Sequence, residues 1–260
     1  MDAVSELLQR LGTELVLPRF RSLEAGQVSE KGPGDLVTVV DHEVEQALEG
    51  ELPLLVPGSR VAGEERAATD PSILHGLGSG TVWIVDPIDG TTNFVEGRPT
   101  FGIMVGLLRE GEVVAGWIHT PVLEEMIVAV AGGGAIRNGE PFVVMETARA
   151  EGPRDMASIR YLPPELKELW SDPELRAAFT PGYGASAIDY PRLVAGEWAS
   201  LFFWRTFPWD HVPGTLIVEE AGGQVARLDG TPYSPVDGNA GLLVAASEAD
   251  WRRVRDKLPD

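Results

Sequence analysis

Two aspartates, Asp86 and Asp89, follow a run of apolar residues near the first third of this 260-residue chain. The run, Val82-Trp83-Ile84-Val85, is typical of a buried strand that stops at a functional turn. In open α/β sheets, ligands usually sit at this end of the strands. Pro87 disfavours a helix here, so both carboxylates can converge on one cation, with the Ile88 carbonyl as a neutral ligand between them. Such oxygen ligands favour Mg²⁺, Mn²⁺ or Ca²⁺.

The next residues, Gly90-Thr91-Thr92-Asn93, are suited to phosphate. They can begin a short helix whose free N–H groups and positive dipole end attract an anion. A purely structural interpretation is also open, because the acids of an Asp-Pro-x-Asp-Gly turn cap their own backbone and its glycine supplies a positive φ. The pattern alone leaves both interpretations in place.

Three further segments offer acids: Gly63-Glu64-Glu65 ahead of the strand, and the stretch from Asp35 to Asp41 and Trp209-Asp210-His211 at predicted helix starts. Each has a structural interpretation of its own. The glutamate pair is typical of a solvated loop, Asp41 of a first-turn acid, and Asp210 of an N-cap ahead of Pro213.

Composition excludes several classes of protein. The chain has 40 acidic and 21 basic residues, a net charge of −19, which disfavours nucleic-acid and membrane partners. It has no cysteine, so disulfides, thiolate metal sites and a cysteine nucleophile are excluded. No basic leader and no spanning apolar run is apparent, which predicts a soluble cytoplasmic protein.

Apolar periodicity predicts helices and strands in both halves of the chain. In the first half we expect a helix over 4–15, a second helix capped by Thr38 or Asp41, and an antiparallel meander of strands at 103–108, 113–118 and 126–130. In the second half, helices at 186–195 and 212–221 alternate with strands at 198–203 and 242–246, and Ser247 begins a last helix. The pattern predicts a mixed α and β (α+β) fold, with a boundary at Ala150-Glu151-Gly152-Pro153 that separates subdomains 1–150 and 151–260.

Taken together, the four acidic segments resemble the inositol monophosphatase family in order and spacing. The resemblance covers nearly the whole chain, and its strongest part is the twelve-residue block from Trp83 to Phe94. It implies a Mg²⁺-dependent, lithium-sensitive phosphomonoesterase with a layered αβαβα sandwich, usually a homodimer.

The resemblance also implies roles for individual residues. The ligands of two or three Mg²⁺ ions would be Glu64, Asp86, Asp89, Asp210 and the Ile88 carbonyl, most of them from subdomain 1–150. Asp41 and Thr91, with Glu64, would be the catalytic residues around the attacking water, and Gly90 and Thr91 would bind the phosphate. Subdomain 151–260 would supply Asp210 and the substrate pocket, and Asp89 and Asp210 would also contact the substrate.

The chain departs from the family pattern at several positions. Phe203 stands where inositol-selective members carry a glutamate that accepts a sugar hydroxyl, and an apolar ring cannot accept that bond. Arg205 favours a second phosphate or a carboxylate on the substrate, or is a structural arginine. Ser186 aligns with a position near the substrate, but serine is also a favoured N-cap. Lys31 is one residue nearer to Asp35 than the family spacing, which leaves its role open.

The leading hypothesis is a phosphatase with inositol 1-phosphate as its first candidate substrate. Fructose 1,6-bisphosphate, a 3′(2′)-phosphonucleotide, NADP and histidinol phosphate stay open as alternatives, because pocket residues decide the substrate on one scaffold. A non-catalytic interaction protein on this scaffold is the alternative from another class. A Ca²⁺-binding structural module would need an EF-hand loop, which the sequence lacks.

Overall fold

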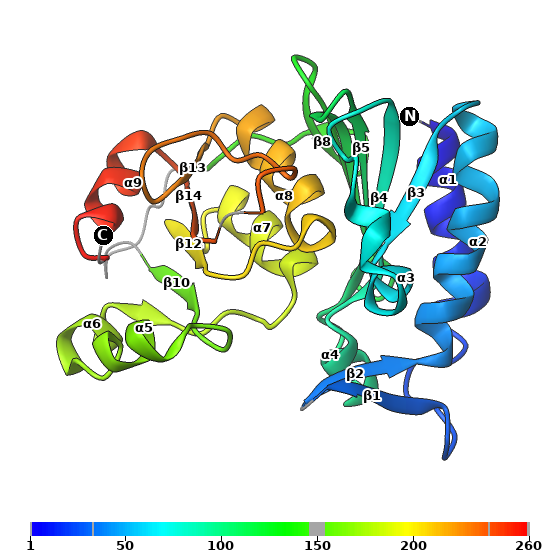
Figure 1. Ribbon diagram of the computed structural model, residues 1–260, viewed down its shortest axis with the longest axis horizontal. Coiled ribbons are helices and arrows are strands. Elements are labelled where there is room, and N and C mark those ends of the chain that lie inside the picture. The colour runs from blue at the N-terminus through cyan, green and yellow to red at the C-terminus, as the bar shows by residue number, and fades with distance from the viewer. Residues whose placement is uncertain (1, 33, 146–153, 239, 259–260) are drawn as a thin grey trace.

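The computed structural model describes residues 2–32, 34–145, 154–238 and 240–258. Helices and sheets alternate in five layers, which confirms the predicted αβαβα sandwich (Figure 1). The outer helices on one side are α1 (Asp2–Leu11), which continues as a π-helical turn (Gly12–Val16), and α2 (Val39–Leu55). The central helices are α7 (Ser186–Val194) and α8 (Pro208–Glu220), and the far layer holds α5 (Pro164–Leu169), α6 (Pro173–Ala177) and α9 (Glu248–Arg255).

The first sheet has seven strands and contains the predicted antiparallel meander. Its order is β3 (Arg60–Gly63), β4 (Thr81–Asp89), β5 (Gly102–Arg109), β6 (Glu112–Thr120), β7 (Glu125–Val130), β8 (Gly134–Arg137) and β9 (Glu140–Pro141). Only the β3–β4 pair among these is parallel.

Strand β4 is longer than predicted, because it does not end before Asp86. Asp86 still pairs with Met104 and Asp89 with Gly102 on β5, and the register shifts between these two pairs. Pro87 lies within the shift, where its missing N–H costs the ladder no bond. The two aspartates therefore lie on a bulged strand end and not on a free turn.

The second sheet has five strands and comes from the second half of the chain. Its order is β11 (Phe179–Thr180), β10 (Asp155–Ser158), β12 (Ser200–Phe203), β14 (Leu242–Ala245) and β13 (Gln224–Arg227). The predicted boundary at 150–153 lies outside the described residues. Within the described ranges, no helix has the length and apolar character that crossing a membrane requires.

Helix α8 packs between the two sheets and lies unusually near the first one, where two glycines face it. A Cβ at Gly106 would come within 2.4 Å of Val212 Cγ1, and one at Gly116 within 2.9 Å of Pro213 Cα. Any larger residue would push the helix away. The two glycines therefore set the distance between the start of α8 and strands β5 and β6, beside β4.

Four smaller elements complete the region around β3 and β4. The hairpin of β1 (Val28–Gly32) and β2 (Asp35–Thr38) leads into α2, and α3 (Glu64–Thr69) follows β3. A 3₁₀ turn (Pro71–Leu74) connects α3 toward β4, and α4 (Thr91–Val95) follows β4.

Candidate active site

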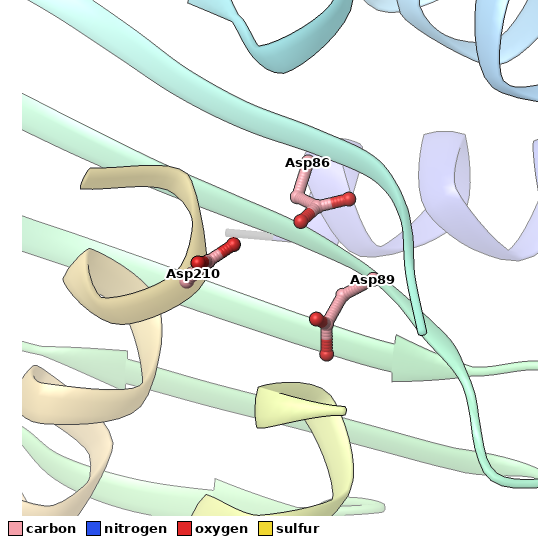
Figure 2. Close-up of side chains that lie close together, drawn as sticks. All are labelled: Asp86, Asp89 and Asp210. Carbon is pink, nitrogen blue, oxygen red and sulfur yellow. The ribbon is translucent and has the colours of Figure 1, made fainter. Parts of the chain in front are cut away.

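Three carboxylates from two distant parts of the chain meet between the first sheet and α8. Asp86 and Asp89 project from β4 and Asp210 from the first turn of α8 (Figure 2). One oxygen from each lies within 4.8 Å of the others, a spacing at which the three groups can hold a metal ion. They line a cavity of about 340 Å³.

Asp210 reaches this position because α8 begins at Pro208, four residues before the predicted start. Phe207 is the N-cap and Asp210 lies inside the first turn, so the interpretation of Asp210 as an N-cap is wrong. Pro208, at the first position of the helix, needs no N–H partner there and so favours this earlier start.

Asp86 and Asp89 are buried and Asp210 is half-buried, and Arg205 pairs with Asp210 only at 3.9 Å. Burial, followed by repulsion from Glu64, raises the pKa of Asp86 well above the usual aspartate range. Burial, followed by repulsion from Asp210, does the same for the pKa of Asp89. Burial and Glu64 also raise the pKa of Asp210 to about 7. Asp86 Oδ1 has no hydrogen-bond partner among the described residues. This set of oxygens therefore fits a hard divalent cation, which would supply the missing partner and the missing charge.

Asp89 is oriented by the start of α7. The Ala187 N–H donates a 2.5 Å hydrogen bond to Asp89 Oδ2. The N-cap of α7 is Ala185, so Ser186 is not the cap that its residue type suggested; it lines the cavity instead. Its neighbour Asp189, which sequence reasoning missed, is buried and accepts the Tyr183 N–H at 3.0 Å.

A chain of hydrogen bonds joins the start of α2 to the end of β4. Thr38 caps α2, and both its N–H and its hydroxyl donate to Asp41 Oδ2, at 2.8 and 2.5 Å. The Thr91 hydroxyl lies 3.2 Å from Asp41 Oδ1 and 2.9 Å from the Ile88 carbonyl. Burial raises the pKa of Asp41 to about 6. Asp41 and Thr91 are thus held together beside the acid cluster.

Gly90 turns the chain from β4 into α4. Its φ is +86°, and a Cβ would come within 2.8 Å of Ala185 Cβ and 3.1 Å of the Thr100 carbonyl. Gly90, Thr91 and Thr92 line the cavity next to Asp89. The position thus excludes side chains both by its dihedral angle and by the lack of space.

Glu64 lines the cavity but lies outside the three-acid cluster. Lys31 Nζ donates to Glu64 Oε1 at 2.7 Å and to Glu65 Oε1 at 2.9 Å. Glu65 is buried, so it is not a solvated residue, and burial together with repulsion from Glu64 raises its pKa to about 8. Sequence reasoning also missed Glu45, whose carboxylate accepts the N–H groups of Glu65 and Arg66, each at 2.8 Å.

The predicted substrate residues of the second half also line the cavity. Phe203 stacks on Tyr190 with ring centroids 5.6 Å apart and meets the His211 ring edge-on at 4.8 Å. Arg205 Nη2 lies 3.9 Å from Asp210 Oδ2.

His211 packs locally, as the sequence predicted. Burial lowers its pKa to about 3, so the ring is neutral. Its Nε2 lies 3.0 Å from the Arg205 carbonyl, which can only accept, so Nε2 carries the hydrogen and Nδ1 accepts from the Tyr190 hydroxyl at 2.8 Å. His211 therefore fixes the backbone of Arg205 and is committed on both nitrogens.

Comparisons with known proteins agree over nearly the whole chain. The model of the inositol monophosphatase family matches residues 1–258. An inositol-1-monophosphatase of Mesorhizobium japonicum is 34% identical over 221 residues, which are 81% of this chain and 79% of the relative. A fructose-1,6-bisphosphatase/inositol-1-monophosphatase of Thermotoga maritima is 32% identical over 231 residues, 88% of this chain and 85% of the relative.

Solved structures share the fold. The extragenic suppressor protein suhB from Bartonella henselae superimposes with a TM-score of 0.84 at 27% identity, covering 100% of this chain and 98% of that one. The IMPase of Thermotoga maritima gives 0.78 at 28% identity, covering 98% and 96%.

Proposed function

This chain belongs to the inositol monophosphatase family of phosphatases, and we propose that it is a Mg²⁺-dependent phosphomonoesterase acting on a small phosphorylated metabolite. The observation that carries the proposal is the set of Asp86, Asp89 and Asp210, the first two buried and the third half-buried, in which one carboxylate oxygen of each lies within 4.8 Å of the others. So dense a negative charge is unfavourable in a fold unless a cation joins it.

The residues that would hold two or three Mg²⁺ ions are these three aspartates, Glu64 and the Ile88 carbonyl. When bound, Mg²⁺ neutralises phosphate charge and lowers the pKa of a coordinated water. The Ile88 carbonyl already accepts from Thr91, and a carbonyl oxygen has a second lone pair for a ligand.

The chain's own groups supply orientation and a proton acceptor. We assign Thr91 and Asp41 to the attacking water, because their oxygens are fixed 3.2 Å apart next to the acid cluster. With a pKa of about 6, Asp41 is ionised at neutral pH and can accept a hydrogen bond from that water. We assign Gly90 and Thr91 to the phosphate oxygens, because both residues line the cavity next to Asp89.

Inositol 1-phosphate is the first candidate substrate, because the curated relatives include enzymes named for it. The alternatives are fructose 1,6-bisphosphate, a 3′(2′)-phosphonucleotide, NADP and histidinol phosphate. Phe203 disfavours selectivity for inositol, since its buried ring offers no acceptor to a hydroxyl.

The test is phosphate release from this panel with Mg²⁺, with EDTA, and with Mg²⁺ plus Li⁺. We expect release that needs Mg²⁺ and that Li⁺ inhibits. Folded, Mg²⁺-loaded protein that releases nothing from any compound would contradict the proposal and favour the interaction-protein alternative. Retention of Asp41, Glu64, Thr91 and the three aspartates argues against that alternative. A homodimer and a cytoplasmic location stay predictions, the first testable by sedimentation velocity.

A further inference from the structure

Arg205 is held in the catalytic cavity by the faces of two aromatic rings. Its guanidinium carbon lies 3.5 Å from the Tyr161 ring centroid and 4.5 Å from that of Phe207. Stacking of this kind uses the flat face of the guanidinium and leaves the N–H groups around its edge available.

Those N–H groups have no hydrogen-bond acceptor within the described part of the chain. Its ion-pair partner, Asp210 Oδ2, is 3.9 Å from Nη2, too long for a hydrogen bond. The side chain is 31% exposed, and the residue lines the cavity together with the acid cluster. Arg205 thus presents a planar set of free donors, held in one orientation, to any molecule in that cavity.

The guanidinium of Arg160, which also lines the cavity, already makes a hydrogen bond. Arg160 donates through Nη2 to the Gly34 carbonyl in the β1–β2 hairpin, so part of its donor set is used. The backbone of Arg205, by contrast, is fixed by His211, and its side-chain N–H groups make no hydrogen bond within the described residues. The chemistry that matches an oriented guanidinium with available N–H groups is a carboxylate or a phosphate, which accepts two parallel N–H bonds.

We propose that Arg205 forms a second anion subsite, next to the acid cluster, and that the preferred substrate carries a second anionic group on its leaving group. This inference rests on the proposed phosphatase function. The reactive phosphate lies at the acid cluster, and a phosphate or carboxylate a few bonds away lies on the edge of the Arg205 guanidinium. Inositol 1-phosphate, which has no second anionic group, is then a poorer substrate than a compound that has one.

The test compares matched pairs that differ only in the second group. Fructose 1,6-bisphosphate against fructose 1-phosphate tests a phosphate, and 3-phosphoglycerate against glycerol 3-phosphate tests a carboxylate. In the wild type we expect a higher kcat/KM for the two-anion member of at least one pair. Loss of one bidentate charged contact in Arg205→Met should lower the ratio of kcat/KM for the two-anion member to kcat/KM for the one-anion member about 10- to 100-fold. Arg252→Met, on the outer helix α9, removes the same charge and should not change that ratio.

Other outcomes overturn the inference. Equal losses for both members of each pair would place Arg205 on the reactive phosphate, and selectivity lost in Arg160→Met but kept in Arg205→Met would place the subsite at Arg160. Calorimetric binding of the same pairs with Mg²⁺ provides a readout that needs no turnover. Selective binding that depends on Arg205, without phosphate release, would contradict the proposed function alone; turnover without selectivity would contradict the second subsite alone.

Discussion

At the residue scale, the carboxylates of Asp86, Asp89 and Asp210 repel one another. This repulsion destabilises the protein without metal and favours the binding of a cation. Asp86 is 1% exposed, one of its oxygens has no hydrogen-bond partner within the described part of the chain, and its pKa is raised well above the aspartate range. A neutral side chain of the same shape removes the repulsion but also removes a ligand.

We therefore expect opposite effects of Asp86→Asn on stability and activity. Without Mg²⁺ the melting temperature should rise, because a buried unpaired charge is lost. With Mg²⁺, kcat/KM should fall by more than about 100-fold, since even residues that only support a metal ligand contribute 10- to 100-fold. Asp256→Asn, at an exposed aspartate, is the matched control. Wild-type turnover in Asp86→Asn would remove Asp86 from the metal site.

At Gly90, two costs of adding a side chain can be measured separately: the steric contact of its Cβ and the strain of the left-handed backbone. Gly90→Ala should lower stability by about 1–3 kcal/mol for its left-handed φ, with a further loss from contact with Ala185 and Thr100. Gly26→Ala has a similar φ of +90°, and apart from its chain neighbours no atom of the described residues lies within 4 Å of the added Cβ, so this variant measures the strain alone. Urea unfolding should show a larger loss of free energy of unfolding for Gly90→Ala than for Gly26→Ala, and Gly90→Ala should also have reduced phosphatase activity. Equal losses of free energy would contradict the predicted steric cost of contact with Ala185 and Thr100.

At the element scale, the local patterns predicted the meander, the central helices and the acid pair on β4. Sequence reasoning placed the start of α8 too late, because Pro208 and Trp209 do not continue the apolar periodicity from which the start was judged. No local pattern shows that Gly106 and Gly116 bring Asp210 to β4, about 120 residues away along the chain. That pairing came from the resemblance alone.

The role of Glu45 was not predicted from the sequence, again because it depends on contacts between distant parts of the chain. Glu45 lies on α2 and resembles any solvated helix acid in the sequence, whereas the fold places its carboxylate at the start of α3. Whether a glutamate is solvated or caps a distant helix depends on tertiary packing, which spacing along one chain does not encode.

A histidine that can titrate near neutral pH, His119 on β6, lies against the first helical segment. His119 is buried, its Nδ1 lies 3.0 Å from the Glu125 carbonyl, and its Nε2 lies close to Gly12. Burial lowers its pKa below 6.5. The folded state thus favours the neutral ring, so its contribution to stability is complete above pH 6.5 and is lost as the pH falls below it.

His119→Asn keeps an N–H donor near the Glu125 carbonyl but cannot be protonated. We expect the wild type to lose more free energy of unfolding than this variant between pH 7.5 and 5.5, so that the difference between the two proteins shrinks. Urea denaturation at both pH values in EDTA measures this, with all other titrating groups common to the pair. Parallel pH profiles would show that His119 is not protonated on unfolding in this range.

At the scale of the whole molecule, the net charge of −19 and the acid cluster both respond to added cations. Any salt screens the general self-repulsion of the surface, and only ions that bind the native site add a linkage term. The two contributions differ in whether they need Asp210, the ligand supplied by the second half of the chain.

We expect Mg²⁺ to raise the melting temperature of EDTA-treated protein beyond NaCl of equal ionic strength. At a free concentration about 100 times the dissociation constant, one site stabilises by about 2.7 kcal/mol, which at this size corresponds to roughly 5–10 °C. Asp210→Asn should abolish most of the additional rise in melting temperature with Mg²⁺, because it removes one proposed metal ligand. The response to NaCl should stay, because the substitution removes only one of nineteen net negative charges. An equal response to MgCl₂ and NaCl in the wild type would mean that the three aspartates meet without binding a metal, and the proposed chemistry would lose its basis.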